Sequence, residues 1–205
     1  MTRRRRFANR LMTVGAVLVL LSVILLLYNL NRDWDAKNSD FEILSELDEA
    51  VQAQEIFRVS KDVKPEFPDD MDSVNIDDVD YVGYITIPAL GVELPVTKTW
   101  SYEKLKLSPC RYAGNVTDGN LVICAHNYRS HFGRLPRLTQ GEEVRFKDVH
   151  GNVTHYQVTA SSVLAPTAIE KVTLSDADLT LFTCTYGGRT RYTVQCAKRN
   201  DIVIN

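Results

Sequence analysis

The stretch LTLFTCTYGGRTRYTV, residues 179–194, sets the first expectation for the fold. An apolar, β-prone run ends at Cys184, a Gly-Gly break follows, and a second β-prone run begins at Arg191. Two such runs joined by about six residues that include glycine predict an antiparallel hairpin. In that hairpin the guanidinium of Arg191 lies near the sulfur of Cys184, and the alternation in RYTV places Arg191 and Thr193 on one face.

Outward from this hairpin, the chain from Tyr81 onward consists of short β-prone runs separated by turns. Strands are predicted at residues 81–88, 92–97, 120–126, 142–148, 153–164, 179–185 and 191–199, with a hairpin over 147–156. Short helices are predicted at residues 101–109, 131–138 and 167–172. Many short strands at close spacing with few helices predict an all-β fold, either a barrel or a sandwich.

The N-terminal region has a different character. Residues 11–28, LMTVGAVLVLLSVILLLY, carry no charge and form a helix of roughly 27 Å, close to the ~30 Å hydrocarbon core of a membrane. A cleaved signal peptide needs a shorter run and a small-residue cleavage site, and a buried core helix needs a polar face. We therefore expect a retained signal anchor. Five arginines precede it, so the N-terminus is expected in the cytoplasm and the remainder outside.

Four segments are therefore expected along the 205 residues. Residues 1–10 form a basic cytoplasmic tail, 11–28 the transmembrane anchor, 29–78 an extracellular helix and acidic linker, and 79–205 the β-rich folded domain. Within the third segment, apolar residues at helical spacing predict a helix over 33–60, and the acidic, proline-containing run 61–80 is interpreted as a linker or surface arm. The net charge of −2, without basic clustering on the folded part, excludes a nucleic-acid-binding role.

The four cysteines allow two interpretations. In an exported domain, Cys110, Cys124, Cys184 and Cys196 are enough for two disulfides. Cys124 and Cys196 lie inside apolar strand-like runs, which favours small buried thiols, and Cys110 is able to pair with either of them. Cys184 differs because it ends its strand, between two threonines. That position fits a buried structural cysteine and an exposed reactive one equally well.

Of the histidines, His126 is the candidate partner of a reactive thiol. NLVICAH brings an apolar strand to an end at His126, as LTLFTC does at Cys184. His150 and His155, in a turn and a polar strand, are interpreted as solvent-exposed bystanders. The spacing of His126 and His131 resembles a pair of metal ligands, but no carboxylate or thiolate cluster completes such a site, so we predict no metal and no cofactor.

An imidazole, a thiol and a guanidinium together suit acyl transfer through a thioester. A free thiol with a pKa of ~8.5 is only a few per cent thiolate near neutral pH, so an imidazole at His126 helps to create the nucleophile at Cys184. The same imidazole can protonate a leaving amine and deprotonate an incoming one. The guanidinium of Arg191 remains protonated and can stabilise the oxyanion formed on the carbonyl.

These motifs resemble the sortases, membrane-anchored cysteine transpeptidases of Gram-positive bacteria. TLFTCTYGGRTRYTV is similar to their cysteine signature followed by an R-x-x-V strand, YVGYITIPALGVELPV to their opening strands, and NLVICAHNYRSHFGRL to their histidine segment. The resemblance covers about residues 80–200. It implies an eight-stranded β-barrel, a catalytic trio of His126, Cys184 and Arg191, and a substrate-binding role for Thr183.

The resemblance also implies substrates and acceptors. Surface proteins would be cleaved at a C-terminal sorting motif of the LPxTG type, and the acyl group would pass to an amine of a peptidoglycan precursor or to a pilin lysine. The single N-terminal anchor and the TCTY variant favour a class B- or D-like enzyme, and no dense carboxylate cluster demands calcium.

Two other classes of function fit the same residues. A membrane-anchored thiol protease or other hydrolase would use the trio with water as the acceptor. A non-enzymatic surface β-barrel module would not need the thiol at all, so replacement of Cys184 and treatment with thiol alkylators would leave its function intact.

Overall fold

The computed structural model describes residues 12–31, 43–48, 50, 71–165, 168, 172, 175–185 and 189–199. The chain divides into two compact units, Met1–Asp35 and Ala36–Asn205. Several predicted segments lie outside the described residues. They are the basic tail, most of the helix 33–60, the first half of the linker 61–80, the helix 167–172 apart from Ala168 and Val172, and the Gly-Gly turn.

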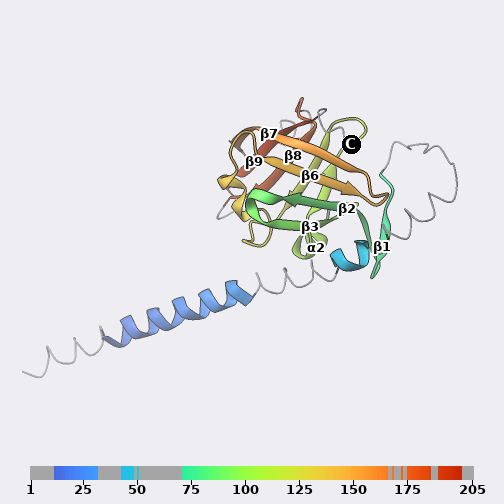
Figure 1. The fold of residues 1–205 in the computed structure, drawn as a ribbon. Helices are drawn as coiled ribbons and strands as arrows, with labels where there is room; N and C mark the ends of the chain where they lie inside the picture. The colour runs from blue at the N-terminus through green and yellow to red at the C-terminus, as the bar shows by residue number, and fades with distance from the viewer. Residues whose placement is uncertain are drawn as a thin grey trace, which may run out of the picture. The chain divides into compact units, whose positions relative to one another are not determined.

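In the first unit the apolar run is a single helix, Met12–Asn31 (Figure 1). Its 20 residues span about 30 Å at ~1.5 Å per residue, and its side chains are exposed. By length and composition the helix is a candidate membrane span.

The second unit is built around a closed β-barrel (Figure 1). The strands follow the order β1-β2-β3-β4-β5-β8-β9-β7-β6, and an additional pairing of β2 with β6 closes the ring. Eight strands, β2 to β9, therefore form the barrel, as predicted, and β1 extends β2 from outside it. Their bounds are β1 Val74–Ile76, β2 Val79–Ile87, β3 Val92–Thr97, β4 Cys110–Ala113, β5 Leu121–Ala125, β6 Glu143–Asp148, β7 Val153–Leu164, β8 Leu179–Cys184 and β9 Arg191–Lys198.

In the part of the chain that the structure describes, the short helical elements between strands include η1 (Pro88–Leu90), α2 (Tyr102–Leu107) and η2 (Phe132–Arg137). Helix α2 begins after Ser101, whose side chain accepts a hydrogen bond from the backbone N–H of Lys104, as a helix N-cap requires. Residues 43–48 are also helical, and Leu47 packs with Ile76 and Tyr81 in a small cluster beside β1 and β2.

The barrel interior is filled by apolar side chains from β2, β3 and β5 to β9, together with η1 and η2. Strand β5 is buried along its whole length because both of its faces are covered. Leu121 and Ile123 face the barrel core, whereas Cys124 packs outside it against Leu105 of α2. Burial on both faces explains why this strand is a continuous apolar run rather than an alternating one.

Two strands differ from the expectation. The run 74–80, interpreted as part of an acidic linker, forms the β1–β2 hairpin, with Asp77 and Asp78 at φ 48° and 61°. Two residues with positive φ make the tight turn typical of hairpins. Aspartate tolerates this backbone conformation, which explains two acidic residues at these positions. Strand β4 was not predicted because it is four residues long and irregular: its register with β5 shifts between Arg111 and Ala113.

Candidate active site

Three neighbouring strands bring the predicted site residues to one edge of the barrel. Strand β8 lies between β5 and β9. In the antiparallel pair β8–β9, Cys184 and Arg191 are directly opposite each other. In the parallel pair β5–β8, Ala125 is opposite Thr183, so His126 follows its strand where Cys184 ends the next. Neighbouring strands are ~4.8 Å apart, and the backbones at 126, 184 and 191 therefore form a row.

The alternation of side chains along these strands separates two faces. Leu181 and Val194 belong to the barrel core, so Phe182 and Cys184, and likewise Arg191 and Thr193, face away from it. Arg191 and Thr193 share one face of β9, as the alternation predicted. This face is the one away from the core, because Tyr192 packs against the core cluster.

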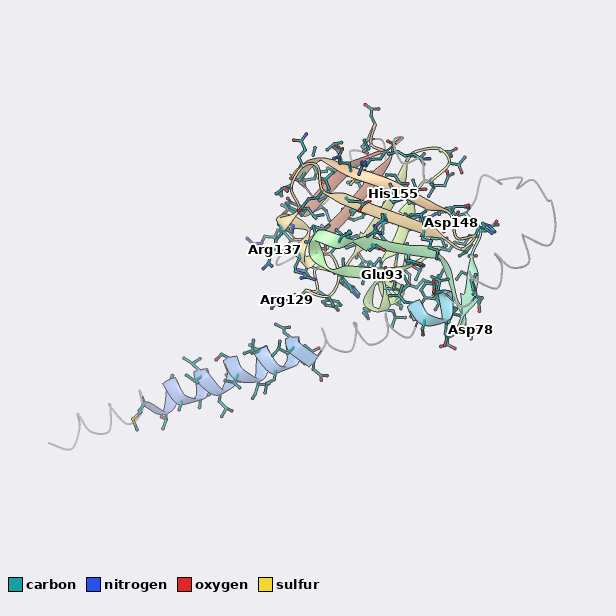
Figure 2. All side chains as sticks on the ribbon, in the orientation of Figure 1. Asp78, Glu93, Arg129, Arg137, Asp148 and His155 are labelled. Atoms are coloured by element: carbon teal, nitrogen blue, oxygen red, sulfur yellow. The ribbon has the colours of Figure 1, made fainter. Side chains whose placement is uncertain are left out.

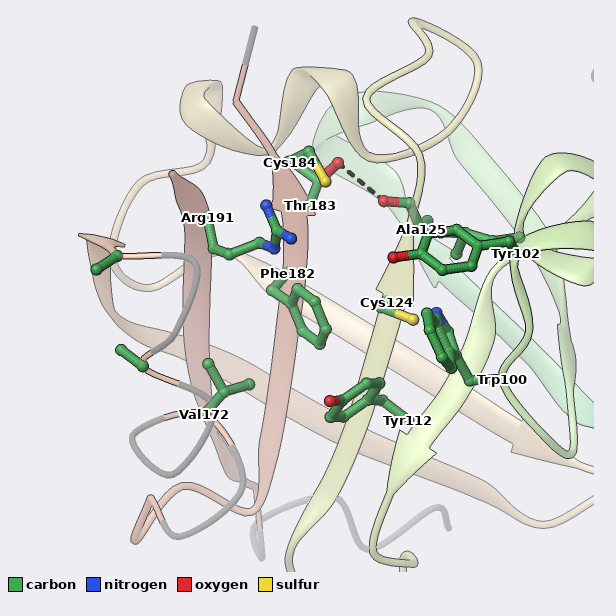
Figure 3. Close-up of a pocket in the computed structure, with 13 residues that line it drawn as sticks. Trp100, Tyr102, Tyr112, Cys124, Ala125, Val172, Phe182, Thr183, Cys184 and Arg191 are labelled. Carbon is green, nitrogen blue, oxygen red and sulfur yellow. Dashed lines mark hydrogen bonds between the residues drawn. The ribbon is translucent and has the colours of Figure 1, made fainter. Parts of the chain in front are cut away.

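Thr183 fixes β8 to β5 directly before the reactive positions. Its side chain is 3% exposed, and its hydroxyl donates a hydrogen bond of 2.8 Å to the carbonyl oxygen of Ala125 (Figure 3). This bond joins the residue before Cys184 to the residue before His126. Thr183 therefore holds the two strand ends in register in addition to lining the pocket described below.

In the loop after β5, His126 contacts one aromatic ring and accepts a backbone hydrogen bond. The imidazole of His126 and the ring of Tyr128 have centroids 4.8 Å apart. The carbonyl oxygen of His126 accepts a bond of 3.2 Å from the N–H of Phe132, which turns the loop back on itself. Gly133 is required there, because an added Cβ would lie 2.4 Å from the carbonyl oxygen of Asn127.

The other histidines have structural surroundings. His131 is fully buried, and its ring lies 5.4 Å from that of Tyr128. His150 Nε2 lies 2.6 Å from a carboxylate oxygen of Asp72, and His155 Nδ1 lies 2.9 Å from one of Glu143. Both are thus paired with carboxylates rather than exposed without partners; Figure 2 shows His155 on the barrel surface. Within the described residues, no three His, Cys, Asp or Glu side chains form a group suited to a metal ion.

A pocket of about 160 Å³ opens beside Cys184 and Arg191 (Figure 3). The guanidinium of Arg191 extends over it toward Cys184. Thr183 also lines it, whereas His126 does not. The remaining wall is mainly apolar and aromatic, formed by Trp100, Tyr102, Leu105, Tyr112, Cys124, Ala125, Ala165, Ala168, Val172 and Phe182.

The aromatic wall is a connected set of rings. Tyr112 meets Phe182 edge-on with ring centroids 5.3 Å apart, and Trp100 meets Tyr112 at 5.9 Å and Tyr102 at 5.0 Å. Sequence reasoning did not find this wall. Phe182 was detectable because alternation places it on the face of Cys184, but Tyr112 lies on the strand that was not predicted.

The turn between the thiol and the guanidinium is closed by its flanking threonines. The backbone N–H of Thr185 donates to the carbonyl oxygen of Thr190 at 3.0 Å, and their hydroxyls lie 2.7 Å apart. These bonds hold the two strands together immediately beyond Cys184 and Arg191, so the two side chains start from fixed backbone positions.

The four cysteines, all of which the structure describes, are free thiols. Cys110, Cys124 and Cys196 are buried, and Cys184 alone is partly exposed. Burial raises the pKa of Cys196 to about 12, so that thiol stays protonated and unreactive near neutral pH. Exposure thus selects Cys184 among the four.

Comparison with known proteins identifies the family. The sortase domain family model matches residues 85–199, and the chain belongs to the sortase family. Sortases are membrane-anchored cysteine transpeptidases that cleave surface proteins at a sorting motif, and this is the class of enzyme to which the chain belongs. The matched residues lie within the predicted catalytic segment 79–205. A search of curated proteins found no match.

Solved structures show the same fold at low sequence identity. Sortase C from Streptococcus pneumoniae has a TM-score of 0.59 and 22% identity, covering 80% of this chain and 100% of that one. A Clostridium perfringens sortase D5 transpeptidase has a TM-score of 0.60 and 17% identity, covering 80% and 99%. Clostridium perfringens sortase C, solved with the C-terminal cell wall sorting motif, has a TM-score of 0.52 and 22% identity, covering 78% and 91%. The class B- or D-like assignment stays a prediction.

Proposed function

We propose that Cys184 is the nucleophile of this transpeptidase, His126 its general acid and base, and Arg191 the group that stabilises the oxyanion. The observation that carries the proposal is the row of strand ends: Cys184 is the Cα partner of Arg191, and the pairing of Ala125 with Thr183 brings His126 beside Cys184. Partial exposure of Cys184 among three buried thiols supports the same choice.

The reaction proceeds in two acyl transfers. The Cys184 thiolate attacks the carbonyl carbon of the scissile amide, forming a C–S bond and an oxyanion beside Arg191. Collapse of this intermediate breaks the C–N bond, and His126 gives its proton to the leaving amine. An acceptor amine then attacks the thioester and loses a proton to His126, the C–S bond breaks, and the thiolate is restored.

We propose that the acyl donor is a surface protein with an LPxTG-like C-terminal sorting motif, and that the acceptor is an amine of a peptidoglycan precursor or a pilin lysine. The pocket beside Cys184 is mainly apolar, which suits an uncharged donor segment. Clostridium perfringens sortase C was solved with the C-terminal cell wall sorting motif, and the structure of Streptococcus pneumoniae sortase C bears on pilin substrate specificity. Thr183, in the pocket wall, contacts the donor near the cleaved bond.

The enzyme acts outside the cell in this proposal. Five arginines precede the candidate span Met12–Asn31, and positive charge is retained on the cytoplasmic side. The barrel then faces the cell wall, where sorting motifs and amine acceptors meet. Protection of the barrel from protease in intact cells without their wall would contradict this orientation.

A product assay tests the function and separates it from hydrolysis. The full-length enzyme in detergent is incubated with sorting-motif peptides, with and without an added amine, and products are identified by mass. We expect amine-dependent formation of the acyl–amine product in the wild-type enzyme and in Cys196→Ala, and none in Cys184→Ala. Release of the free acid alone, at a rate that the amine does not change, would show a hydrolase.

A further inference from the structure

Two buried thiols, Cys110 and Cys124, lie at the wall of the pocket that holds Cys184, and Cys124 lines that pocket. Cys110 begins β4, Cys124 lies in β5, and the two residues are directly opposite each other in the antiparallel pairing. Opposed residues in such a pair have Cα atoms about 4.5–5.5 Å apart, inside the 4.4–6.8 Å range in which disulfides form. A bond between these two sulfurs therefore needs no rearrangement of the backbone.

The two thiols also influence each other chemically. They are 0% and 2% exposed and pack together against Leu105 outside the barrel core. A hydrogen bond from the Cys124 thiol lowers the pKa of Cys110, whereas that hydrogen bond and burial raise the pKa of Cys124. The thiolate of either residue is the species that attacks a disulfide.

The other two cysteines are placed where they do not compete. Cys196 belongs to the barrel core, on the opposite side of the sheet from the outer cluster of Cys110 and Cys124. Cys184 lies two residues beyond Phe182, the partner of Cys124. Strand spacing and rise per residue put Cys184 and Cys124 roughly 8 Å apart at Cα, beyond the ~7 Å limit for a bridge.

We propose that Cys110 and Cys124 form a cross-strand disulfide in the exported enzyme, which links β4 to β5 at the wall of the active-site pocket and leaves Cys184 free. The oxidant is a small disulfide or an exported oxidoreductase in its disulfide form. Two thiols lose two protons and two electrons to form the S–S bond, and the disulfide of the oxidant is reduced to two thiols. The location outside the cell rests on the orientation proposed above.

The bond would strengthen the least extensively paired strand of the barrel. Strand β4 has a single register pair with β3, Thr97 with Cys110, and an irregular register with β5. Tyr112 on this strand supports the aromatic wall through its contacts with Phe182 and Trp100. A covalent link at the start of β4 would therefore hold one wall of the pocket in place.

Thiol mapping of the full-length protein tests the proposal. The protein is folded in detergent with oxidised and reduced glutathione, denatured, tagged with a maleimide at free thiols and mapped by mass spectrometry. We expect a peptide linked through Cys110 and Cys124, with tags on Cys184 and Cys196. Four tagged cysteines, or a bond between any other pair, would overturn the proposal. This readout counts thiols rather than turnover, so the proposed function and the disulfide can fail independently.

Variants measure the effect of the bond on stability. Closing a loop of about 15 residues should raise the Tm of the oxidised wild-type protein by about 5–10 °C over the reduced protein. The same comparison should show no shift in Cys110→Ala or Cys124→Ala, and an undiminished shift in Cys196→Ala. A Cys110–Cys124 disulfide that is found by mass spectrometry but does not raise the Tm would contradict the proposal that the bond stabilises β4.

Discussion

The pocket beside Cys184 and the pocket beside the β6–β7 turn belong to the same barrel but differ in their polar groups. The second is larger, about 310 Å³, and it contains Asp72, Asp148 and His150. There His150 pairs with Asp72 at 2.6 Å, and Asp148 accepts hydrogen bonds from the backbone N–H groups of His150 and Asn152. Those interactions close a hairpin and attach the chain before β1.

In the smaller pocket the polar groups come from the ends of neighbouring strands and meet an apolar wall. Neither a larger pocket volume nor the presence of a histidine and carboxylates marks the active site. A partly exposed thiol opposite an arginine, at the ends of strands held in register by Thr183, is the more informative combination. Substitutions at the two pockets test this contrast.

The largest effect is expected for the thiol. Cys184→Ala should lower turnover by more than about 10⁴-fold, because no other group at the strand end can form the thioester. Turnover is measured by the amine-dependent product assay, and circular dichroism checks the fold. Cys196→Ala is the matched control, since it also removes a thiol but from the barrel core. Equal turnover of Cys184→Ala and the wild type would refute the assignment.

The proposed general acid–base residue, His126, is compared directly with His150 of the second pocket. His126→Ala should reduce turnover by about 10²–10⁴-fold, the usual range for a general acid–base group. His150→Ala should leave turnover within about twofold of the wild type, as expected for a surface substitution away from the site. Steady-state rates of the two variants at one pH provide the test, and comparable losses in both would remove the distinction.

The guanidinium is expected to contribute somewhat less. Arg191→Ala should lower kcat by about 10²–10³-fold, corresponding to roughly 3–4 kcal/mol of transition-state stabilisation. Arg191→Lys should recover part of this loss, because it keeps the charge but not the planar fork of donors. Arg189→Ala, at an exposed position on the same turn, serves as the control. A loss from Arg189→Ala as large as that from Arg191→Ala would argue against a specific role.

A smaller effect is expected where the strands are joined. Thr183→Val removes the bond to the carbonyl oxygen of Ala125 and should cost about 1–3 kcal/mol of folding stability, with reduced turnover. Thr183→Ser keeps a hydroxyl and should recover most of both. Thermal unfolding followed by a rate measurement checks the pair, and identical behaviour of the two variants would exclude the hydrogen bond as the cause.

The smallest effect is expected at the second pocket. Asp72→Asn removes the carboxylate that pairs with His150 at a partly exposed position, and should change the free energy of unfolding by less than about 1 kcal/mol. Turnover should not change. A large loss of turnover without loss of fold would mean that this pocket takes part in the reaction.

Much of the fold and site was predictable from the sequence because it depends on local patterns. Strand ends at Cys184 and His126 follow from apolar runs that stop at polar residues, and the hairpin places Arg191 opposite Cys184. The pairing of β5 with β8 was not derivable from spacing, because a parallel pair joins segments more than 50 residues apart and a local pattern does not encode such a contact. The aromatic wall was missed because Tyr112 lies on β4, which is four residues long and irregular in its pairing with β5.

Peptide mapping tests whether Cys184 carries the acyl group. The enzyme is stopped with acid during turnover of a sorting-motif peptide, and its peptides are identified by mass. We expect one acyl adduct, carried by Cys184 as a thioester, that accumulates without an amine and disappears when the amine is added. Product formation with no adduct on Cys184, or with the acyl group on another cysteine, would contradict the account.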